Sequence, residues 1–346
     1  MQLNPVGIDL AKSVFQLSIT NSKHAVIERK RVSRAQFHKW LATSEPRKLI
    51  MEACATSHYW GRQARGYGHQ VVLLHAHYVR PYVRRDKTDA ADADALVEAS
   101  RNPDLKPIPI KNEEQQALQS LHRIRTQWVG ARTARGNEAR ALLLEFGVVL
   151  PRGTTKLQEE LRLASGRIPV LLQGAMHRLA DEISELSERL RQLDTELSAY
   201  AKASPVCQRL MTIPGVGVII ATALVGRVQD LHRFKSARSF SSWLGITARE
   251  TSSGNTRHLG PISRRGDTYL RTLLTHGARS ALLAARRQQR SDKPLTHIQN
   301  WALNLEQRSC HNKATIALAN KMARSIWAIW TGETTYNGND ALRFAA

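Results

Sequence analysis

Val6-Gly7-Ile8-Asp9-Leu10-Ala11-Lys12 is the stretch that decides the fold of the N-terminal region. Its apolar residues occupy every second position, which is typical of a β-strand with one face buried. The same alternation recurs at residues 15–19, and a third strand is expected at residues 25–32. Three consecutive strands with short connections predict a meander that opens a sheet.

Helix and strand signals alternate after this meander. Ser33 and Gln36 form a capping-box pattern at the start of a helix. Lys48-Leu49-Ile50-Met51-Glu52 is a short apolar strand that ends abruptly in a carboxylate, and Val71-Val72-Leu73-Leu74 has the pattern of a buried strand. These signals predict an α/β domain with a mixed central sheet, which we place at residues 1–108.

Four carboxylates in this region are candidates for a metal site. Asp9 interrupts the first strand, where aspartate is uncommon, and Glu52 ends the next apolar strand. Asp89 and Asp92 are three residues apart in the alanine-rich Lys87-Thr88-Asp89-Ala90-Ala91-Asp92-Ala93-Asp94, so a helix would present both on one face. Such oxygen ligands suit Mg²⁺, which Mn²⁺ can replace, and the set meets the needs of two-metal phosphoryl transfer. The alternative is an acidic first helical turn and two exposed strand residues.

The charge balance predicts a polyanionic partner. Lys and Arg total 51 against 29 Asp and Glu, a formal net charge of +22. Nucleic acid is the partner that we favour, and a membrane surface is the alternative. The chain has no apolar run of about eighteen residues and no leader, which predicts a soluble protein with no membrane association. Cys54, Cys207 and Cys310 lack zinc spacing and fit a reducing cytoplasm.

Residues 109–203 are predicted to form a helical connector. Its first part is rich in arginine, including Arg123 and Arg132, and we expect a surface for phosphate backbones, with simple solvation as the alternative. Its second part carries apolar residues spaced alternately four and three apart, which predicts a coiled coil with either the preceding helix or another subunit. The repeat comprises Leu172, Met176, Leu179, Ile183, Leu186, Leu190, Leu193, Leu197 and Tyr200.

Residues 204–332 are expected to form a mainly helical domain, followed by a loose tail at residues 333–346. Pro214-Gly215-Val216-Gly217 lies between helical runs and has the pattern of a helix-hairpin-helix turn. Gly215 and Gly217 would let backbone amides approach a phosphate, although a tight turn between helices needs similar residues.

The loop Ser252-Ser253-Gly254 is a candidate for nucleophilic chemistry. A serine hydroxyl among guanidinium groups could attack a phosphodiester while the arginines stabilise the transition state. Serine beside glycine is also ordinary loop composition. The neighbouring basic residues are Arg249, Arg257, Arg264 and Arg265.

Taken in order, these motifs resemble the DEDD-type insertion-sequence transposases, the insertion-sequence one-ten family and its eleven-eleven branch. The resemblance extends from about residue 5 to about residue 330. It implies a RuvC-like N-terminal domain of ribonuclease-H fold, a coiled-coil connector and a mainly α transposase domain. The family's acids fall on Asp9, Glu52, Asp89 and Asp92, which would be catalytic and bind the metal. Its catalytic serine falls on Ser253, because glycine follows it.

The resemblance also implies an activity and its partners. We expect Mg²⁺-dependent cleavage and exchange of double-stranded donor and target DNA through the serine, guided by a structured bridge RNA. We also expect a homo-oligomer, a dimer or a tetramer, in the bacterial cytoplasm on the nucleoid. Asp94 lies outside the pattern and is expected to be solvated or to support the other acids. The alternatives are a RuvC-like metal-dependent nuclease without serine chemistry and a nucleic-acid-binding regulator without chemistry.

Overall fold

Two compact units make up the chain, Met1–Glu114 and Gln115–Ala346. The computed structural model describes residues 3–83, 88–153 and 157–337. Residues 338–346 of the expected tail lie outside the described residues, and the finer division into three domains and a tail stays a prediction. No helix in the described ranges is long and apolar enough to cross a membrane.

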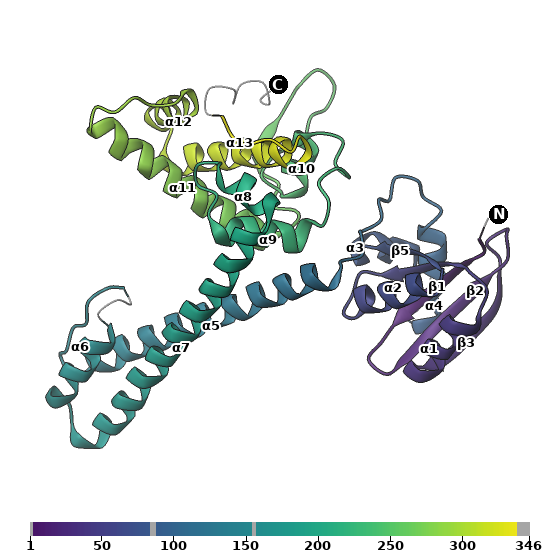
Figure 1. The fold of residues 1–346 in the computed structure, drawn as a ribbon, viewed down its shortest axis with the longest axis horizontal. Coiled ribbons are helices and arrows are strands. Elements are labelled where there is room, and N and C mark those ends of the chain that lie inside the picture. Colours follow the sequence, from purple (N-terminus) through teal and green to yellow (C-terminus); the bar gives the residue numbers. More distant parts are fainter. Residues whose placement is uncertain (1–2, 84–87, 154–156, 338–346) are drawn as a thin grey trace. The chain divides into compact units, whose positions relative to one another are not determined.

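The first unit is built on one mixed five-stranded sheet (Figure 1). Its strand order is β3-β2-β1-β4-β5, with antiparallel pairs β1–β2 and β2–β3 and parallel pairs β1–β4 and β4–β5. The predicted mixed α/β architecture is therefore confirmed. The elements are β1 (Pro5–Leu10), β2 (Val14–Thr20), β3 (Val26–Ser33), α1 (Arg34–Thr43), β4 (Lys48–Glu52), α2 (Ser57–Gly66), β5 (Gln70–Leu74), α3 (Ala76–Val79), a short 3-10 helix (Arg80–Tyr82) and α4 (Asp89–Ala99).

Helices cover both faces of this sheet. On one face Phe15 of β2 packs edge-on against Phe37 of α1, at a centroid distance of 5.0 Å, and against Trp60 of α2 at 5.3 Å. On the other face Ile50 of β4 packs with Leu96 of α4 in a second apolar cluster. The two clusters hold the sheet between α1 and α2 on one side and α4 on the other.

Glycine at position 7 allows α4 to touch the sheet. A Cβ atom on Gly7 would lie 2.0 Å from the carbonyl oxygen of Ala93, so a larger residue would push α4 away from β1. The helix begins with Thr88, whose Oγ1 accepts a hydrogen bond from the amide of Ala91 at 3.2 Å. The first turn of α4, which carries two of the candidate acids, is thereby fixed against β1.

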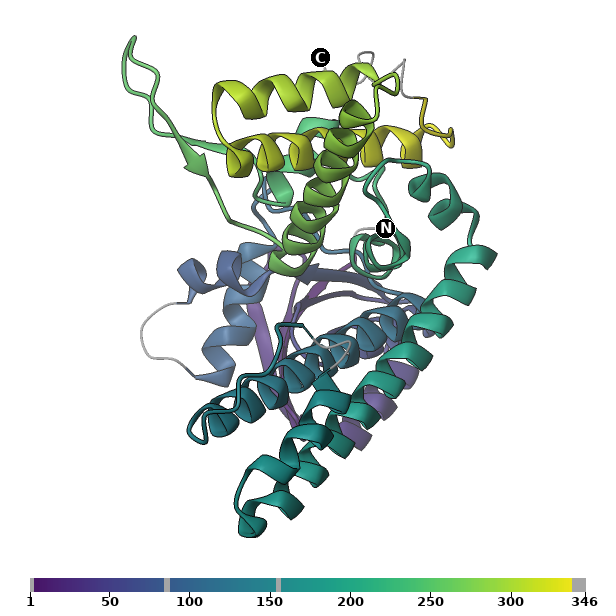
Figure 2. The same ribbon diagram turned by 90° about the vertical axis from the view of Figure 1, so that its left-hand side faces the viewer.

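The second unit is mostly helical, as predicted (Figures 1 and 2). Its long helix α5 starts at the boundary between the units, and the only sheet among its described residues is a two-stranded antiparallel one formed by β6 and β7. The elements are α5 (Glu113–Leu144), α6 (Leu157–Ala164), a short 3-10 helix (Ser165–Arg167), α7 (Val170–Ala203), α8 (Pro205–Met211), α9 (Val218–Val228), α10 (Ala237–Trp243), β6 (Ala248–Glu250), β7 (Leu259–Ile262), α11 (Thr268–Arg290), α12 (His297–Arg308) and α13 (His311–Thr331).

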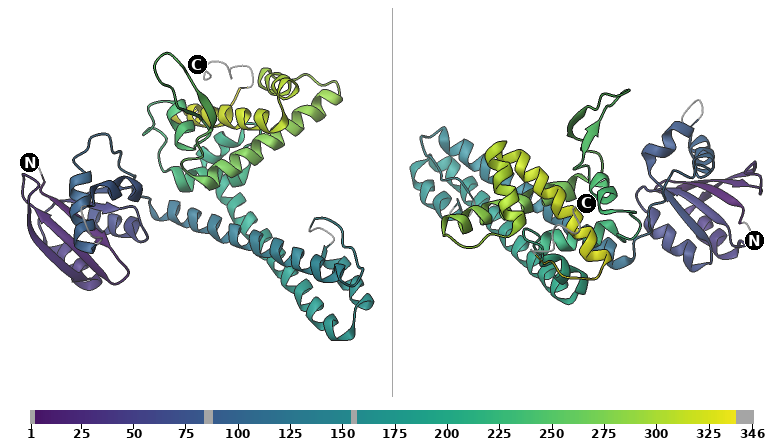
Figure 3. Two further views of the ribbon diagram at one scale, coloured as in Figure 1. Left: turned by 180° about the vertical axis from the view of Figure 1, so that it is seen from behind. Right: turned by 90° about the horizontal axis from the view of Figure 1, so that it is seen from above.

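The apolar heptad positions of α7 pack against other helices of the same chain. Met176 and Ile183 form one apolar cluster with Leu143 of α5 and Leu161 of α6. This cluster lies at the end of the long helices where α6 is found (Figure 3). At the other end of α7, Ala201 belongs to the core formed by α8–α13. Of the two alternatives for the stripe, the intramolecular one is therefore the arrangement that the structure contains, and an oligomer stays a prediction.

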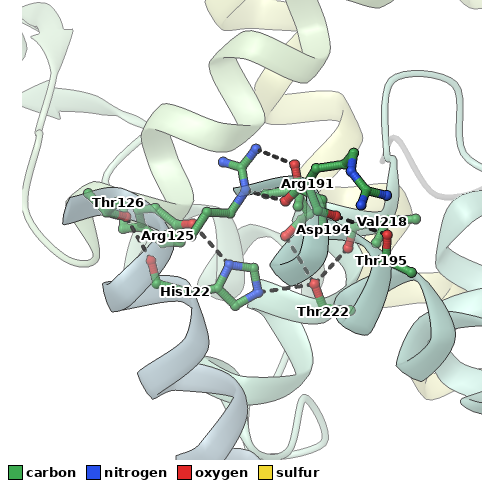
Figure 4. A network of polar contacts seen from close by, with 10 residues as sticks. His122, Arg125, Thr126, Arg191, Asp194, Thr195, Val218 and Thr222 are labelled. Atoms are coloured by element: carbon green, nitrogen blue, oxygen red, sulfur yellow. Dashed lines mark hydrogen bonds and ion pairs between the residues drawn. The ribbon is translucent and has the colours of Figure 1, made fainter. Parts of the chain in front are cut away.

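A buried histidine ties α5 to the helical bundle (Figure 4). His122 is 1% exposed, and its ring nitrogens lie 3.0 Å from Tyr269 Oη and 3.0 Å from Thr222 Oγ1. Thr222 donates its hydroxyl hydrogen to the carbonyl of Val218 at 2.7 Å, so it accepts from Nε2 of His122. The neutral ring with its proton on Nε2 satisfies these partners, because Nδ1 can then accept from the tyrosine.

Acid should weaken this junction. Burial, and then the charges of Arg227 and Arg125, lowers the pKa of His122 to about 4. An unfolded chain protonates this histidine below about 6.5 and the folded chain only below about 4, so the free energy of unfolding falls as pH decreases across that window. Between about pH 7 and about pH 5, we expect His122→Gln to remove about 2 kcal/mol of the acid-induced loss, at about 1.4 kcal/mol for each pH unit below 6.5.

Urea unfolding at about pH 7 and about pH 5 measures this effect, because the difference between the two curves contains the histidine contribution. His276→Gln, at an exposed position of α11, is the matched control and should leave the pH dependence unchanged. An identical pH dependence in His122→Gln and the wild type would contradict the assignment.

Candidate active site: four carboxylates and a serine hairpin

Two strands and one helix position the four candidate acids. Asp9 is the last residue but one of β1, and Glu52 is the last residue of the neighbouring parallel strand β4. The carboxyl ends of adjacent parallel strands lie at one edge of a sheet, which is where α/β folds place their ligands. Asp89 and Asp92 occupy the first turn of α4, the helix that packs on β1.

The four carboxylates interact electrostatically. The pKa of Asp9 is raised from 3.8 to about 6, first by burial and then by the charges of Asp89, Asp92 and Glu52. Each of these groups therefore lies near enough to Asp9 to oppose its ionisation. All four predicted acids lie in the first unit, and three of them raise the pKa of the fourth.

A divalent cation fits this set in charge and in donor type. Carboxylate oxygens are the ligands of Mg²⁺ and Mn²⁺, and a cation among them would relieve the repulsion that raises the pKa of Asp9. Within the described residues, no group of three or more His, Cys, Asp or Glu side chains converges closely enough to hold a metal ion. The side chains Asp9, Glu52, Asp89 and Asp92 are those that would hold one.

Asp94 is fixed by other partners. Its carboxylate accepts a hydrogen bond from Ser18 Oγ at 2.5 Å and forms an ion pair with Arg29, with Nη2 2.7 Å from Oδ2. These contacts join α4 to β2 and β3. Asp94 therefore supports the position of the helix and is not simply solvated. The sequence gives no direct signal for Ser18 or Arg29, because their pairing with α4 depends on the packing of the sheet.

Cys54 is a neighbour of the site that the sequence pattern did not reveal. It follows Glu52 by two residues, and its Sγ lies 3.9 Å from the carbonyl oxygen of Leu10. Burial raises the pKa of the Cys54 thiol, and the charges of Glu52 and Asp9 raise it further. The thiol is therefore kept protonated beside the carboxylates.

The candidate serine lies on an exposed hairpin. Strands β6 and β7 are antiparallel, and the residues between them project away from the helices of this unit (Figure 2). Ser253 and Thr256 close the end of the hairpin with reciprocal backbone hydrogen bonds of 3.2 and 3.1 Å. Between them Gly254 has φ +55°, a left-handed conformation that glycine adopts without strain.

The two adjacent serines differ in their hydrogen bonding. Ser252 Oγ donates to Glu250 Oε1 at 2.9 Å and accepts from the amide of His258 at 3.3 Å. Glu250 also binds Arg257, with Oε1 3.0 Å from Nε. Ser253 Oγ makes no hydrogen bond to any described residue and is exposed. The hydroxyl of Ser253 is thus available to a substrate, whereas that of Ser252 stabilises the hairpin.

The hairpin and its base carry the four predicted arginines. Arg257 is held by Glu250, and Arg249 Nη2 donates to the carbonyl of Ser263 at 3.3 Å. Arg264 and Arg265 are exposed at the base. There a Cβ on Gly245 would lie 1.9 Å from the carbonyl oxygen of Arg265, so two backbone segments cross in close contact.

The two glycines of the predicted helix-hairpin-helix turn have different surroundings. Gly215 has φ +90°, and a Cβ there would lie 2.5 Å from the carbonyl oxygen of Gly277 in α11. Packing against α11 therefore explains Gly215. Gly217 is exposed at the start of α9 with open space around it, so a phosphate could approach its backbone.

The two predicted arginines of α5 also differ. Arg123 is exposed. Arg132 is half-buried, and its Nε is buried without a hydrogen-bond partner among the described residues.

Comparison with known proteins finds relatives along nearly the whole chain. The model of the family described as "Transposase IS116/IS110/IS902 family" matches residues 207–293, and a second transposase model, of the DEDD type, matches residues 6–147. A probable family 20 transposase of Pseudomonas aeruginosa is 39% identical over 343 residues, covering 97% of this chain and 99% of the relative. The transposase for insertion sequence element IS1111A of Coxiella burnetii is 39% identical over 335 residues (96% and 90%), and that for IS1328 of Yersinia enterocolitica is 34% identical over 336 residues (96% and 98%).

Proposed function

Because this chain belongs to the IS110 family of transposases, an enzyme family that moves DNA, we propose that it cuts and rejoins DNA strands with Ser253 as the nucleophile. Mg²⁺, which Mn²⁺ can replace, is the cofactor, held by Asp9, Glu52, Asp89 and Asp92. A regulator without chemistry is set aside by the family membership.

The observation that carries this proposal is the coupling of Asp9 to the other three acids. Its pKa of about 6 reflects burial and three neighbouring carboxylates, an arrangement that costs stability unless a cation balances it. When bound, the cation polarises the scissile phosphate and lowers the cost of the charge that develops on it. The order of the five strands, with an antiparallel meander followed by two parallel strands, supports a RuvC-like ribonuclease-H fold for this unit.

In the serine step, each phosphodiester bond that is broken in the DNA is replaced by a phosphoester bond to Ser253. Ser253 Oγ loses its proton and forms a bond to the phosphorus, while the bond from phosphorus to the leaving strand's oxygen breaks and that oxygen gains a proton. A hydroxyl of the second strand then attacks the phosphoserine, the new strand is joined, and Ser253 is released. Strand exchange of this kind needs no nucleotide cofactor. The exposed, unbonded hydroxyl of Ser253 supports its role over that of Ser252.

The partners follow from the family and from charge. Donor and target DNA duplexes are the substrates, a structured bridge RNA guides their choice, and a homo-oligomer, dimer or tetramer, acts on both duplexes in the cytoplasm. A formal charge of +22 supports binding of two kinds of nucleic acid at once. The serine and the acids lie on different units of the chain.

A reconstituted reaction tests the proposal. We expect joined donor–target product only when the protein, both DNAs, a transcript of the non-coding DNA that flanks the gene, and Mg²⁺ are all present. EDTA should abolish the product and excess Mn²⁺ should restore it. Cleavage that releases free ends without joining, and that needs no RNA, would instead indicate a metal-dependent nuclease.

A further inference from the structure

An open cleft lies between the two long helices of the second unit. Side chains of α5 and α7 enclose about 620 Å³, within the size range of ligand sites, roughly 300–1,000 Å³. The α7 part of the lining runs from Ser187 to Lys202, which is about 22 Å of helix axis. The cleft is therefore elongated, and neither a candidate acid nor a residue of the serine hairpin is among the residues that line it.

The cleft is basic, and part of its charge is unpaired. Among the described residues that line it, Arg125, Arg132, Arg191 and Lys202 are cationic and Asp194 is anionic. Arg125 is already paired with Asp194, with Nε 2.6 Å from Oδ1 (Figure 4). Arg191 is likewise paired with a glutamate outside the cleft, at 2.6 Å.

Arg132 and Lys202 are the cations available to a ligand. Neither forms an ion pair with a carboxylate in the described part of the chain; Arg132 is half-buried and Lys202 is exposed. Ser198 makes no hydrogen bond to another described residue, so its hydroxyl can also donate. Two of these groups are cations and the third is a hydroxyl that can donate, so an anionic ligand rich in acceptors suits them.

We propose that this cleft binds the sugar–phosphate backbone of a nucleic-acid strand, with Arg132 and Lys202 contacting separate phosphates. Its length suits a strand better than a single small anion, and the apolar side chains Val129 and Leu190 offer a surface for sugars between the charges. The inference rests on the proposed function in taking nucleic acid as the partner. It does not depend on the serine chemistry.

The salt dependence of binding tests this cleft. The probes are a random-sequence DNA duplex and a folded RNA hairpin, each titrated with the full-length protein across a range of salt concentrations. We expect Arg132→Gln/Lys202→Gln to make the slope of log binding constant against log salt shallower by about two, since each lost phosphate contact removes about 0.9. A change for DNA, for RNA or for both identifies the source of the backbone.

Two control variants test whether the change in salt dependence is specific to the cleft. Arg178→Gln/Arg189→Gln removes the same charge from exposed positions of α7 outside the cleft and should leave the slope nearly unchanged. Arg132→Lys preserves the charge and should preserve the slope even if the guanidinium geometry is lost. Unchanged slopes for both probes in the cleft variant, or an equal change in the control variant, would overturn the proposal.

If the cleft proposal is wrong, the experiments give a different result than if the serine mechanism is wrong. The same titrations in a Ser253→Ala background need no chemistry and report on the cleft alone. Conversely, adduct formation by the wild-type protein reports on the serine and does not depend on the cleft variant. Loss of binding to a poly-glutamate probe, with both nucleic acids unaffected, would assign the cleft to an acidic protein partner and refute a nucleic-acid site.

Discussion

Replacement of Ser253 by alanine is expected to eliminate covalent protein–DNA adducts and to reduce strand joining by at least about 10⁴-fold, the scale seen when a nucleophile is removed. The hairpin should stay folded, because its end is closed by backbone hydrogen bonds between Ser253 and Thr256. Binding of DNA and RNA should therefore be retained. Denaturing gels with labelled DNA measure the adducts, and filter binding measures the affinity.

The neighbouring serine supplies a matched control. Ser252 Oγ is engaged with Glu250 and with the amide of His258, so Ser252→Ala removes stabilising contacts but not the free hydroxyl. We expect this variant to form adducts, at a lower yield if the hairpin loosens. Adducts that persist in Ser253→Ala and disappear in Ser252→Ala would reverse the assignment.

Replacement of a single candidate acid should also strongly reduce DNA cleavage. Asp9→Asn and Asp92→Asn each remove one of the four interacting carboxylates, and we expect each to reduce metal-dependent cleavage by more than about a hundredfold. Asp9→Asn should also raise the metal-free melting temperature, because it removes a partly buried charge beside three others. Cleavage assays and thermal unfolding, each with Mg²⁺ and with EDTA, measure the two effects.

Asp94→Asn is the control for a carboxylate on the same helix. Asp94 pairs with Arg29 and Ser18, and this pair is partly exposed, so its loss should cost no more than about 1 kcal/mol of stability. Cleavage should stay near the wild-type level. A fully active Asp9→Asn variant, or an Asp94→Asn variant as inactive as Asp92→Asn, would refute the metal site as we assign it.

Local patterns were sufficient to predict the sheet. Alternation in residues 5–10 and 14–20, together with the Ser33–Gln36 capping box, depends on neighbours in sequence, and each element formed where it was expected. The positions of Asp9 and Glu52 depend on which strands are adjacent, and those of Asp89 and Asp92 depend on where α4 packs. Parallel pairing of β1 with β4 then brought Asp9 and Glu52 to one edge.

Features that depend on tertiary packing could not be predicted in the same way. The heptad repeat of α7 indicates an apolar stripe, but the same stripe suits α5, α6 or another subunit equally well. Gly215 matches a phosphate-binding turn in sequence, and only the approach of Gly277 reveals that helix packing requires it. Likewise, the roles of Ser252 and Asp94 depend on Glu250 and Arg29, residues whose side chains the sequence does not pair.

Identification of the residue attached to DNA tests the central claim most directly. The wild-type protein is stalled on a donor duplex that carries a nick close to the cleavage site, the adduct is digested with protease and nuclease, and the modified peptide is sequenced by mass spectrometry. We predict a nucleotide linked to the hydroxyl of Ser253, formed only with Mg²⁺ or Mn²⁺. A nucleotide on any other residue, or cleaved DNA with no attached peptide, would contradict the account.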